Sequence, residues 1–284
     1  MTGRTVLRAL AGTLVLGTFA CAPARPRLPQ GPWSPAPEAV EWFTEASGRC
    51  ASVRTLTAEI AVVGRAGETR VRGRLIAGLE RAGSLRLEAP APFGAPAFIL
   101  AARDVETVLY FPRDGRVLTG ASVADVLEAL AGIRRGAGDL HALLSGCLVA
   151  DRRPSNGRVA GTAWAQVDLG GGVAAFLRNT DGRWAIAGGR QPADVSRSDR
   201  GSWAVEYTAV VAGLPRAILF SSGEADSKGG IAATLSLTLS QLETNVPIAP
   251  SAFTLGVPPG TLPLSLEELR QMGPLADRRA GRDR

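Results

Sequence analysis

Residues 231–243 read IAATLSLTLSQLE, and this stretch decides the fold class. Every odd position from 235 to 239 is leucine, whereas every even position from 234 to 240 is serine or threonine. Successive side chains of a β-strand point to opposite faces, so this alternation predicts a strand with one apolar face and one polar face. Such a strand is typical of an antiparallel sheet that covers a core with one side only.

The same alternation recurs along most of the chain. We predict further strands at residues 56–62, 69–79, 84–89, 98–102, 105–111, 158–168, 173–177, 184–187, 203–211, 217–221 and 253–257. Stretches that contain glycine predict turns at 64–67, 114–115 and 170–172. Helical spacing of apolar residues predicts a helix at 38–50, two short helices within 122–147 with Ser122 as the first N-cap, and a last helical turn at 265–272.

These elements predict a mainly β protein. Roughly eleven or twelve strands joined by tight turns predict a single large curved antiparallel sheet, because a sheet of this size must curl to bury its apolar face. Two or three short helices are too few to cover it as a layer, but they can fill the mouth of an incomplete β-barrel of about 11 strands. No domain boundary and no repeat of fixed period interrupts residues 38–260, so we expect one domain there.

The composition is that of a globular protein, with 45% hydrophobic and 20% charged residues. The sequence has one histidine, His141, and one lysine, Lys228, so almost every cation is an arginine, which cannot act as a base. It contains no Gly-x-Ser-x-Gly elbow, no zinc-ligand spacing and no phosphate-loop motif. We therefore predict that the protein is not an enzyme and binds no cofactor and no metal.

The formal net charge is +6, with an isoelectric point of about 10.2. Residues 1–20 hold two arginines and no acids, so their removal leaves 30 basic and 26 acidic residues, a net charge of +4. Several of the remaining arginines lie in residues 278–284, which we expect to form a basic disordered tail. The sequence has no basic helix, zinc finger or aromatic ribonucleoprotein motif, so we expect no nucleic-acid partner.

The N-terminus, MTGRTVLRALAGTLVLGTFAC, has the layout of an export signal over residues 1–20. Arg4 and Arg8 precede an uncharged apolar stretch at 10–20 that is too short for an ordinary transmembrane span. Cys21 follows at once, and residues 22–37 are rich in proline, which resembles a bacterial lipoprotein with a lipidated Cys21 and a tether over 21–37. Ordinary cleavage after residue 20 is the alternative, because Thr18 stands where the lipoprotein pattern has leucine.

Two further cysteines, Cys50 and Cys147, remain in the exported chain. Disulfides persist in the compartments that exported proteins reach. A Cys50–Cys147 bridge would close a loop 97 residues long, for which chain entropy gives about 4–5 kcal/mol of stabilisation. We predict this disulfide; two buried thiols are the alternative, since Cys147 lies in an apolar run.

The order of these elements resembles the LolA/LolB family, a bacterial periplasmic lipoprotein carrier and its outer-membrane receptor. Four local patterns carry the resemblance: LTAEIAV at 56–62, GRLI at 73–76 with LRLEA at 85–89, PFG at 92–94 with FIL at 98–100, and FTLGVPPG at 253–260. The resemblance covers most of residues 38–260 and implies an incomplete barrel whose helical lid encloses an apolar cavity for acyl chains. An anchored chain looks like the receptor, although the extension at 261–284 departs from the receptor pattern.

The anchor and the resemblance together imply a lipid-anchored protein of the bacterial cell envelope, at the outer membrane facing the periplasm. We expect a monomer that takes acyl chains or lipoproteins as cargo, for lipoprotein transfer or insertion. Position 22 is Ala rather than Asp, which permits sorting to the outer membrane where an aspartate retention rule operates. The alternative is an envelope scaffold or sensor lipoprotein of the same fold, with a filled core and a protein partner.

The candidate cavity residues lie on the inward sides of the clearest strands. They are Ile60, Val62, Leu85, Leu87, Leu109, Phe111, Trp203, Val205, Tyr207, Leu235, Leu237 and Leu239. A filled core would use the same residues, so the pattern leaves both readings open. Phe93 matches the apolar tip of the receptor's membrane or cargo loop, with packing back onto the barrel as the alternative. A row of three arginines, Arg70, Arg72 and Arg74, predicts a strand face that is exposed to solvent. The alternative is that these arginines bind lipid phosphates.

Overall fold

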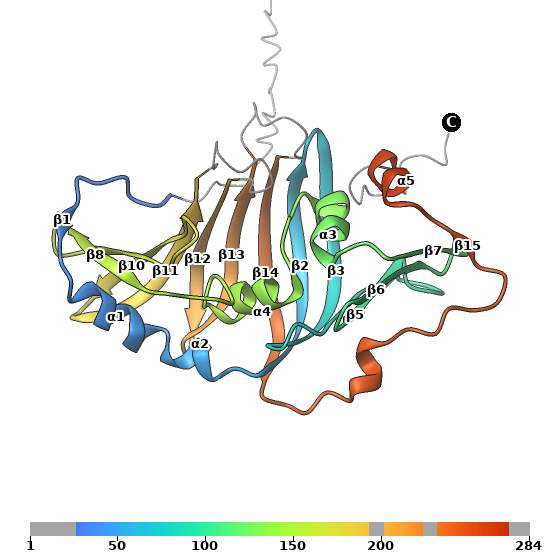
Figure 1. The fold of residues 1–284 in the computed structure, drawn as a ribbon, viewed down its shortest axis with the longest axis horizontal. Helices are drawn as coiled ribbons and strands as arrows, with labels where there is room; N and C mark the ends of the chain where they lie inside the picture. The colour runs from blue at the N-terminus through green and yellow to red at the C-terminus, as the bar shows by residue number, and fades with distance from the viewer. Residues whose placement is uncertain (1–26, 193–201, 224–231, 273–284) are drawn as a thin grey trace, which may run out of the picture.

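The computed structural model of the chain describes residues 27–192, 202–223 and 232–272 (Figure 1). The strands are β1 (Ser34–Pro35), β2 (Thr55–Ala66), β3 (Thr69–Glu80), β4 (Leu85–Ala89), β5 (Phe98–Arg103), β6 (Glu106–Phe111), β7 (Arg116–Thr119), β8 (Ser155–Ala160), β9 (Trp164–Asp168), β10 (Ala174–Thr180), β11 (Arg183–Gln191), β12 (Trp203–Val211), β13 (Leu214–Ser222), β14 (Ala233–Thr244) and β15 (Leu262–Pro263). The helices are α1 (Ala39–Ala46), α2 (Gly48–Ser52), α3 (Val123–Ala131), α4 (Ala137–Ser145), α5 (Leu266–Gln271) and the 3-10 helix η1 (Pro250–Phe253).

The described strands form one curved sheet in the order β1-β8-β9-β10-β11-β12-β13-β14-β2-β3-β4-β5-β6-β7-β15. Every neighbouring pair is antiparallel except β7 with β15, which is parallel. β1 and β15 stand at the two edges, and hydrogen bonds do not close the sheet between them. The predicted fold class, a mainly β protein with one large, incompletely closed antiparallel sheet, is therefore confirmed.

The pairing of β14 with β2 explains why the sheet has two unlike faces. Leu237 stands beside Val62 and Leu239 beside Ile60, and each of these four residues is at most 8% exposed. Thr238 lies between the two leucines and is exposed on the other side. We call the side that carries the leucines the concave face and the opposite side the convex face.

Short helices lie against the concave face (Figure 1). α1 packs against β8, β9 and β11, while α4 contacts β3 and β13. α3 begins after Ser122, whose Oγ accepts a hydrogen bond from the backbone N–H of Asp125, and it ends at Gly132 in the left-handed region (φ 69°). The predicted helices at 38–50 and within 122–147 are confirmed, the first as the pair α1 and α2.

The predicted turn at 64–67 is wrong over its first three residues. β2 continues to Ala66, and only Gly67 and Glu68 make the turn to β3. Gly64 instead lies on the concave side of β2, paired with Leu235 of β14. A Cβ at position 64 would collide with the carbonyl oxygen of Thr234 and with the Cα of Leu235. The glycine therefore permits a close approach of two strands rather than a turn.

Replacing Gly64 with alanine is expected to lower the free energy of unfolding by about 1–3 kcal/mol, because the backbone of β14 must shift to make room. Gly73→Ala is the matched control on the neighbouring strand, since a Cβ there meets no atom within 4 Å. The control is expected to be neutral or stabilising by up to about 1 kcal/mol. Chemical denaturation of both variants measures the difference, and equal losses of stability would refute the explanation.

Several other strand boundaries also differ from the predictions. The predicted strand at 158–168 is two strands, β8 and β9, separated by a turn at 161–163. The predicted strand at 253–257 is wrong, because η1 ends at Phe253 and irregular chain follows. β7 and the two-residue strands β1 and β15 have too little alternation to show in the sequence, so the described sheet has 15 strands instead of about 11.

Both ends of the described chain join the edges of the sheet. Ser34 pairs with Val159 at one edge, and at the other Leu262 donates its N–H to the carbonyl oxygen of Gly115 (2.8 Å). These short strands occupy backbone groups that would otherwise be open for pairing with another chain. The sheet thus extends beyond residues 38–260 on both sides, through β1 at one edge and β15 at the other.

Candidate functional site

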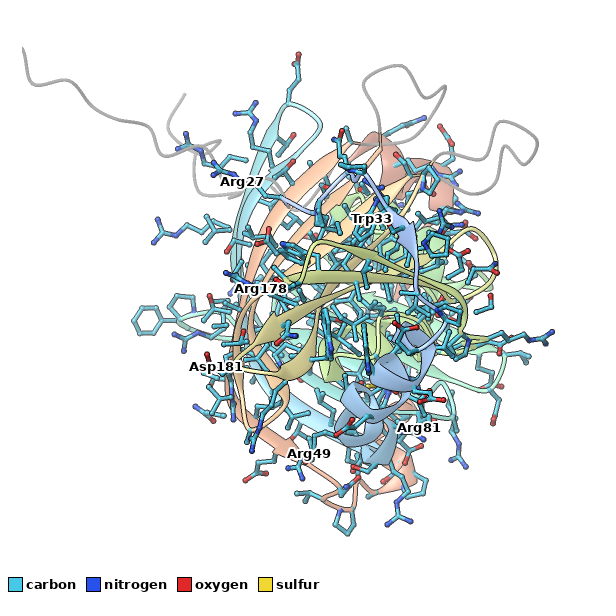
Figure 2. All side chains as sticks on the ribbon, turned by 90° about the vertical axis from the view of Figure 1, so that its left-hand side faces the viewer. Arg27, Trp33, Arg49, Arg81, Arg178 and Asp181 are labelled. Atoms are coloured by element: carbon cyan, nitrogen blue, oxygen red, sulfur yellow. A yellow bond between two sulfur atoms is a disulfide. The ribbon has the colours of Figure 1, made fainter. Side chains whose placement is uncertain are left out.

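The twelve candidate cavity residues all lie on the concave face, and each is at most 8% exposed. The list comprises Ile60, Val62, Leu85, Leu87, Leu109, Phe111, Trp203, Val205, Tyr207, Leu235, Leu237 and Leu239. They belong to one hydrophobic cluster that also includes apolar residues of α1, α3 and α4. Side chains occupy the space between the sheet and these helices (Figure 2). The concave face is therefore one continuous apolar surface, and the helices cover it.

α3 and α4 supply the leucines that contact this surface. Leu127 and Leu130 come from α3, and Leu140, Leu143 and Leu144 come from α4. Every residue of α4 from 140 to 145 is buried, as expected for a helix that is enclosed on all sides. We call α3, α4 and the segment 132–136 between them the lid.

Arg135 places a positive charge beneath the lid. Its guanidinium lies 3.9 Å from the ring centre of Trp203, and Nη1 lies 3.9 Å from a carboxylate oxygen of Asp139. Nη2 is buried and has no hydrogen-bond partner. Burial lowers the pKa of Arg135 to about 10, against the opposing effect of the Asp139 charge. Arg135 could not be predicted as a site residue, because nothing in the pair Arg134-Arg135 shows which arginine turns inward.

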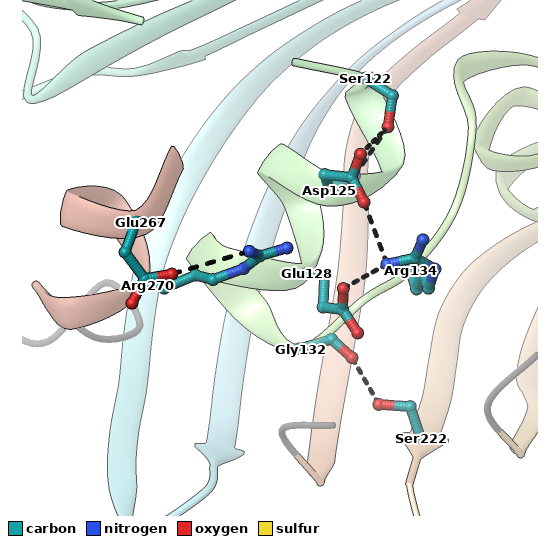
Figure 3. A network of polar contacts seen from close by, with 8 residues as sticks. All are labelled: Ser122, Asp125, Glu128, Gly132, Arg134, Ser222, Glu267 and Arg270. Carbon is teal, nitrogen blue, oxygen red and sulfur yellow. Dashed lines mark hydrogen bonds and ion pairs between the residues drawn. The ribbon is translucent and has the colours of Figure 1, made fainter. Parts of the chain in front are cut away.

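Arg134 turns outward and ties the lid together (Figure 3). Its Nη1 contacts the carboxylates of Glu128 (2.6 Å) and Asp125 (3.0 Å), both on α3. Ser222 at the end of β13 donates its hydroxyl to the carbonyl oxygen of Gly132 (2.5 Å). The segment after α3 is therefore fixed to α3 itself and to the sheet.

Cys50 of α2 and Cys147, just after α4, form a disulfide with their Cα atoms 5.5 Å apart. This is the pairing that the sequence predicts. Arg81 also fixes α2, by donating to the carbonyl oxygens of Cys50 (3.3 Å) and Val53 (2.7 Å). One end of the lid is thus covalently attached to the helices at the start of the domain.

His141 lies inside α4 and is only 2% exposed. Its Nε2 is buried without a hydrogen-bond partner. Burial, and secondly the positive charge of Arg81, lowers the pKa of His141 to about 4. The imidazole is therefore neutral at physiological pH and packs as part of the lid.

Phe93 is 90% exposed at the tip of the loop between β4 and β5. Arg113 holds this loop by donating to the carbonyl oxygens of Phe93 and Ala95, each at 3.0 Å. The side chain does not fold back onto the barrel. An exposed phenylalanine on a braced loop is an apolar group available for contact.

Arg70, Arg72 and Arg74 are exposed on the convex face of β3, as the alternation predicts. Arg74 lies 3.3 Å from Glu59 of β2. Because each guanidinium can form two parallel hydrogen bonds with a phosphate or carboxylate, this row can bind anions.

A groove on the convex face was not predicted from the sequence. It has a volume of about 410 Å³ and lies between the sheet and the segment 248–253. Glu59, Glu88, Glu243 and Arg86 line it, with Arg86 bound to Glu88 at 3.3 Å. None of the twelve candidate cavity residues lines this groove. No local pattern predicts this groove, because it forms where a C-terminal segment, distant in the sequence, crosses the strands.

The predicted signal peptide (1–20), the predicted lipidation site Cys21 and the predicted basic tail after residue 272 lie outside the described residues. Within the described ranges, no helix has the length and apolar character needed to cross a membrane. The same ranges contain no group of three or more His, Cys, Asp or Glu side chains placed to bind a metal ion.

No family model and no curated protein matches the sequence. Among solved structures, the chain is similar to a LolA superfamily protein from Nitrosomonas europaea, with a TM-score of 0.51 and 10% identity over 78% of this chain and 98% of that one. A DUF1329 family protein from Desulfovibrio piger gives a TM-score of 0.46 at 10% identity, over 78% of this chain and 98% of that chain. LprF from Mycobacterium bovis gives 0.31 at 13% identity, over 76% and 98%. The first of these likenesses, together with the open curved sheet and its short covering helices, shows that this chain has a LolA-like fold.

Proposed function

We propose that the protein is a lipid-anchored component of the bacterial envelope that holds acyl chains, free or carried by lipoproteins, on its concave face. One observation carries the proposal: a continuous apolar surface of a LolA-like sheet lies beneath a lid that contacts it through leucines. An acyl chain requires only a dry surface of aliphatic and aromatic side chains. It can take the place of the lid leucines, because both present the same chemistry to the sheet.

The attachments of the lid indicate which part moves to admit a ligand. The disulfide at Cys147 holds the C-terminal end of α4 close to α2. α3 is joined to the sheet by the hydrogen bond from Ser222 to Gly132, whereas the ion pairs of Arg134 lie within the lid and do not attach it to the sheet. We therefore expect α3 and the segment 132–136 to separate from the sheet first, with α4 rotating about its fixed end.

The proposed mechanism is binding and transfer without covalent chemistry. We assign the anchor to a lipidated Cys21, the membrane to the outer membrane, and the oligomeric state to a monomer. Saturable binding of a fluorescent fatty acid by the purified protein tests the ligand class, and an intact mass showing a diacylglyceryl group on Cys21 tests the anchor. A protein that binds no acyl probe but retains a protein partner from the envelope would support the scaffold function instead.

Phe93 is proposed as the tip that contacts membrane or cargo. Phe93→Ala is expected to change the free energy of unfolding by no more than about 0.5 kcal/mol, because the side chain is exposed. Phe98→Ala, five residues later on β5, is the matched control; Phe98 is 2% exposed and its truncation should cost about 3–5 kcal/mol. Denaturation midpoints and liposome co-sedimentation are measured for both variants. Unchanged liposome association in Phe93→Ala would remove this residue from the proposal.

A further inference from the structure

The convex face is covered unevenly by the two ends of the described chain. The N-terminal segment crosses β10 to β12: Leu28 packs at Gly188, and the ring of Trp33 lies 5.9 Å from that of Phe176 (Figure 2). The C-terminal segment crosses β4 and β5, where Arg86 donates to the carbonyl oxygen of Ala252 (3.3 Å). Between these two segments, the N-terminal part of β3 and the adjoining part of β2 remain open to solvent.

Four exposed arginines occupy this open area, and we call them the arginine face: Arg65, Arg70, Arg72 and Arg74. Arg65 pairs with Arg70 across the β2–β3 hairpin, and Val63, which is 50% exposed, pairs with Arg72. Like charges directly opposite each other destabilise a sheet, so an Arg–Arg pair is not explained by folding. The neighbouring strand β14 adds serine and threonine hydroxyls on the same side.

The acidic residues near the arginine face do not neutralise it. Glu59 is 3.3 Å from Arg74 and also accepts a hydrogen bond from Gln241 (2.9 Å). Glu68 in the hairpin turn offers its backbone carbonyl, not its carboxylate, to Arg65 (2.8 Å). Among the described residues, four guanidinium groups thus stand against two carboxylates, and this described surface carries net positive charge.

The start of the described chain lies on the same face. The backbone N–H of Arg27 donates to Glu206 of β12 (2.7 Å). From Glu206, directly paired residues on adjacent strands form one row that crosses the sheet to β3. The row consists of Glu206, Leu219, Ser236, Val63 and Arg72. Four strand spacings separate the ends of this row, so Arg27 enters the convex face about 19 Å from Arg72. Cys21 is six residues earlier in the sequence and can reach at most about 20 Å from Arg27.

We infer that the arginine face is the surface by which this protein lies on an anionic lipid bilayer. The inference rests on the proposed anchor at Cys21, which would keep the membrane within reach of this face. Guanidinium groups bind lipid phosphates with paired hydrogen bonds, and basic residues close to an anionic membrane surface are attracted to it. The convex face then meets the membrane, while the lid on the concave face stays free to open.

The test uses the mature chain, residues 21–284, with Cys21→Ser so that no lipid is attached. Co-sedimentation is measured with vesicles of phosphatidylcholine and with vesicles of mixed phosphatidylglycerol and phosphatidylcholine. Parent protein should bind the mixed vesicles preferentially, and Arg70→Glu/Arg72→Glu should weaken that binding by about tenfold or more. The control Arg153→Glu/Arg183→Glu makes the same charge change at two exposed arginines elsewhere, one just before β8 and one at the start of β11, and should stay within about twofold of the parent.

Three results would overturn the inference. The parent and the Arg70→Glu/Arg72→Glu variant could bind the mixed vesicles equally, or the control variant could lose as much vesicle binding as the test variant. Millimolar glycerol phosphate could also abolish vesicle binding completely, which would indicate a site for small soluble anions. The fluorescent fatty-acid assay on the same variants separates this inference from the proposed function. Arginine-dependent vesicle binding without acyl binding would refute the function and keep the membrane face. Acyl binding together with vesicle binding that does not depend on the arginines would refute the membrane face and keep the proposed function.

Discussion

Replacing both Cys50 and Cys147 with alanine is expected to lower the free energy of unfolding by about 4–5 kcal/mol. The bridge joins residues 97 positions apart, and cross-linking a loop of that length removes much of the conformational freedom of the unfolded chain. This is a large share of the stability of an ordinary domain. The loss should be measured by urea denaturation of the parent and of the double variant under identical conditions.

Two controls accompany the cysteine prediction. Parent protein in dithiothreitol should unfold at the same urea concentration as the double variant, because reduction removes the same constraint. Non-reducing peptide mapping of periplasmic material should recover the Cys50–Cys147 pair. Two thiols that alkylate freely in the native parent protein, or a double variant within about 1 kcal/mol of the parent, would contradict the prediction.

Acidification from pH 6.5 to pH 4 is expected to destabilise the protein through His141, by about 2–3 kcal/mol. The pKa of His141 falls from 6.5 to about 4 on folding, so the unfolded state binds the proton more readily across this range. The contribution to stability is therefore fully present above pH 6.5 and is lost as the pH falls toward 4. His141 is the one histidine in the sequence, which makes this window diagnostic.

His141→Leu provides the matched control for the acid prediction. Leucine fills a similar space in α4 and removes the buried Nε2 that has no partner. Between pH 6.5 and pH 5, where few carboxylates titrate, the stability of this variant should hardly change, whereas that of the parent should fall. Parallel curves for parent and variant over that interval would show that His141 is not buried in its neutral form.

The sequence predicts those parts of the fold that depend on local pattern. β14 alternates leucine with serine or threonine over residues 234–240, and burial of one side of that part follows directly. α3 carries its own start signal in Ser122 and its own stop signal in Gly132. The composition of residues 1–37 was enough to predict an anchor-like segment. Alternation along the strand was enough to predict that Arg70, Arg72 and Arg74 are exposed.

The features that the sequence does not predict depend on contacts between distant segments. Gly64 looks like part of a turn until β14 is placed beside it. Phe253 lies in a stretch that resembles a strand, yet it closes η1 and packs against the convex side of the sheet, where it lines the groove. Arg135 is buried only because the lid turns it toward Trp203. The arginine face follows from alternation, but its position on the same row as Arg27 follows from the register of five strands.

The measurement that tests the central claim most directly is photocrosslinking with a fatty acid that carries a diazirine near the end of its chain. The purified protein is irradiated with increasing amounts of this probe, and the labelled residues are mapped by peptide mass spectrometry. Acyl binding on the concave face predicts saturable labels on the concave side of β14, at Leu235 to Leu239, and on the lid leucines of α4. Labelling that does not saturate, or that is confined to Phe93 and the convex face, would contradict it.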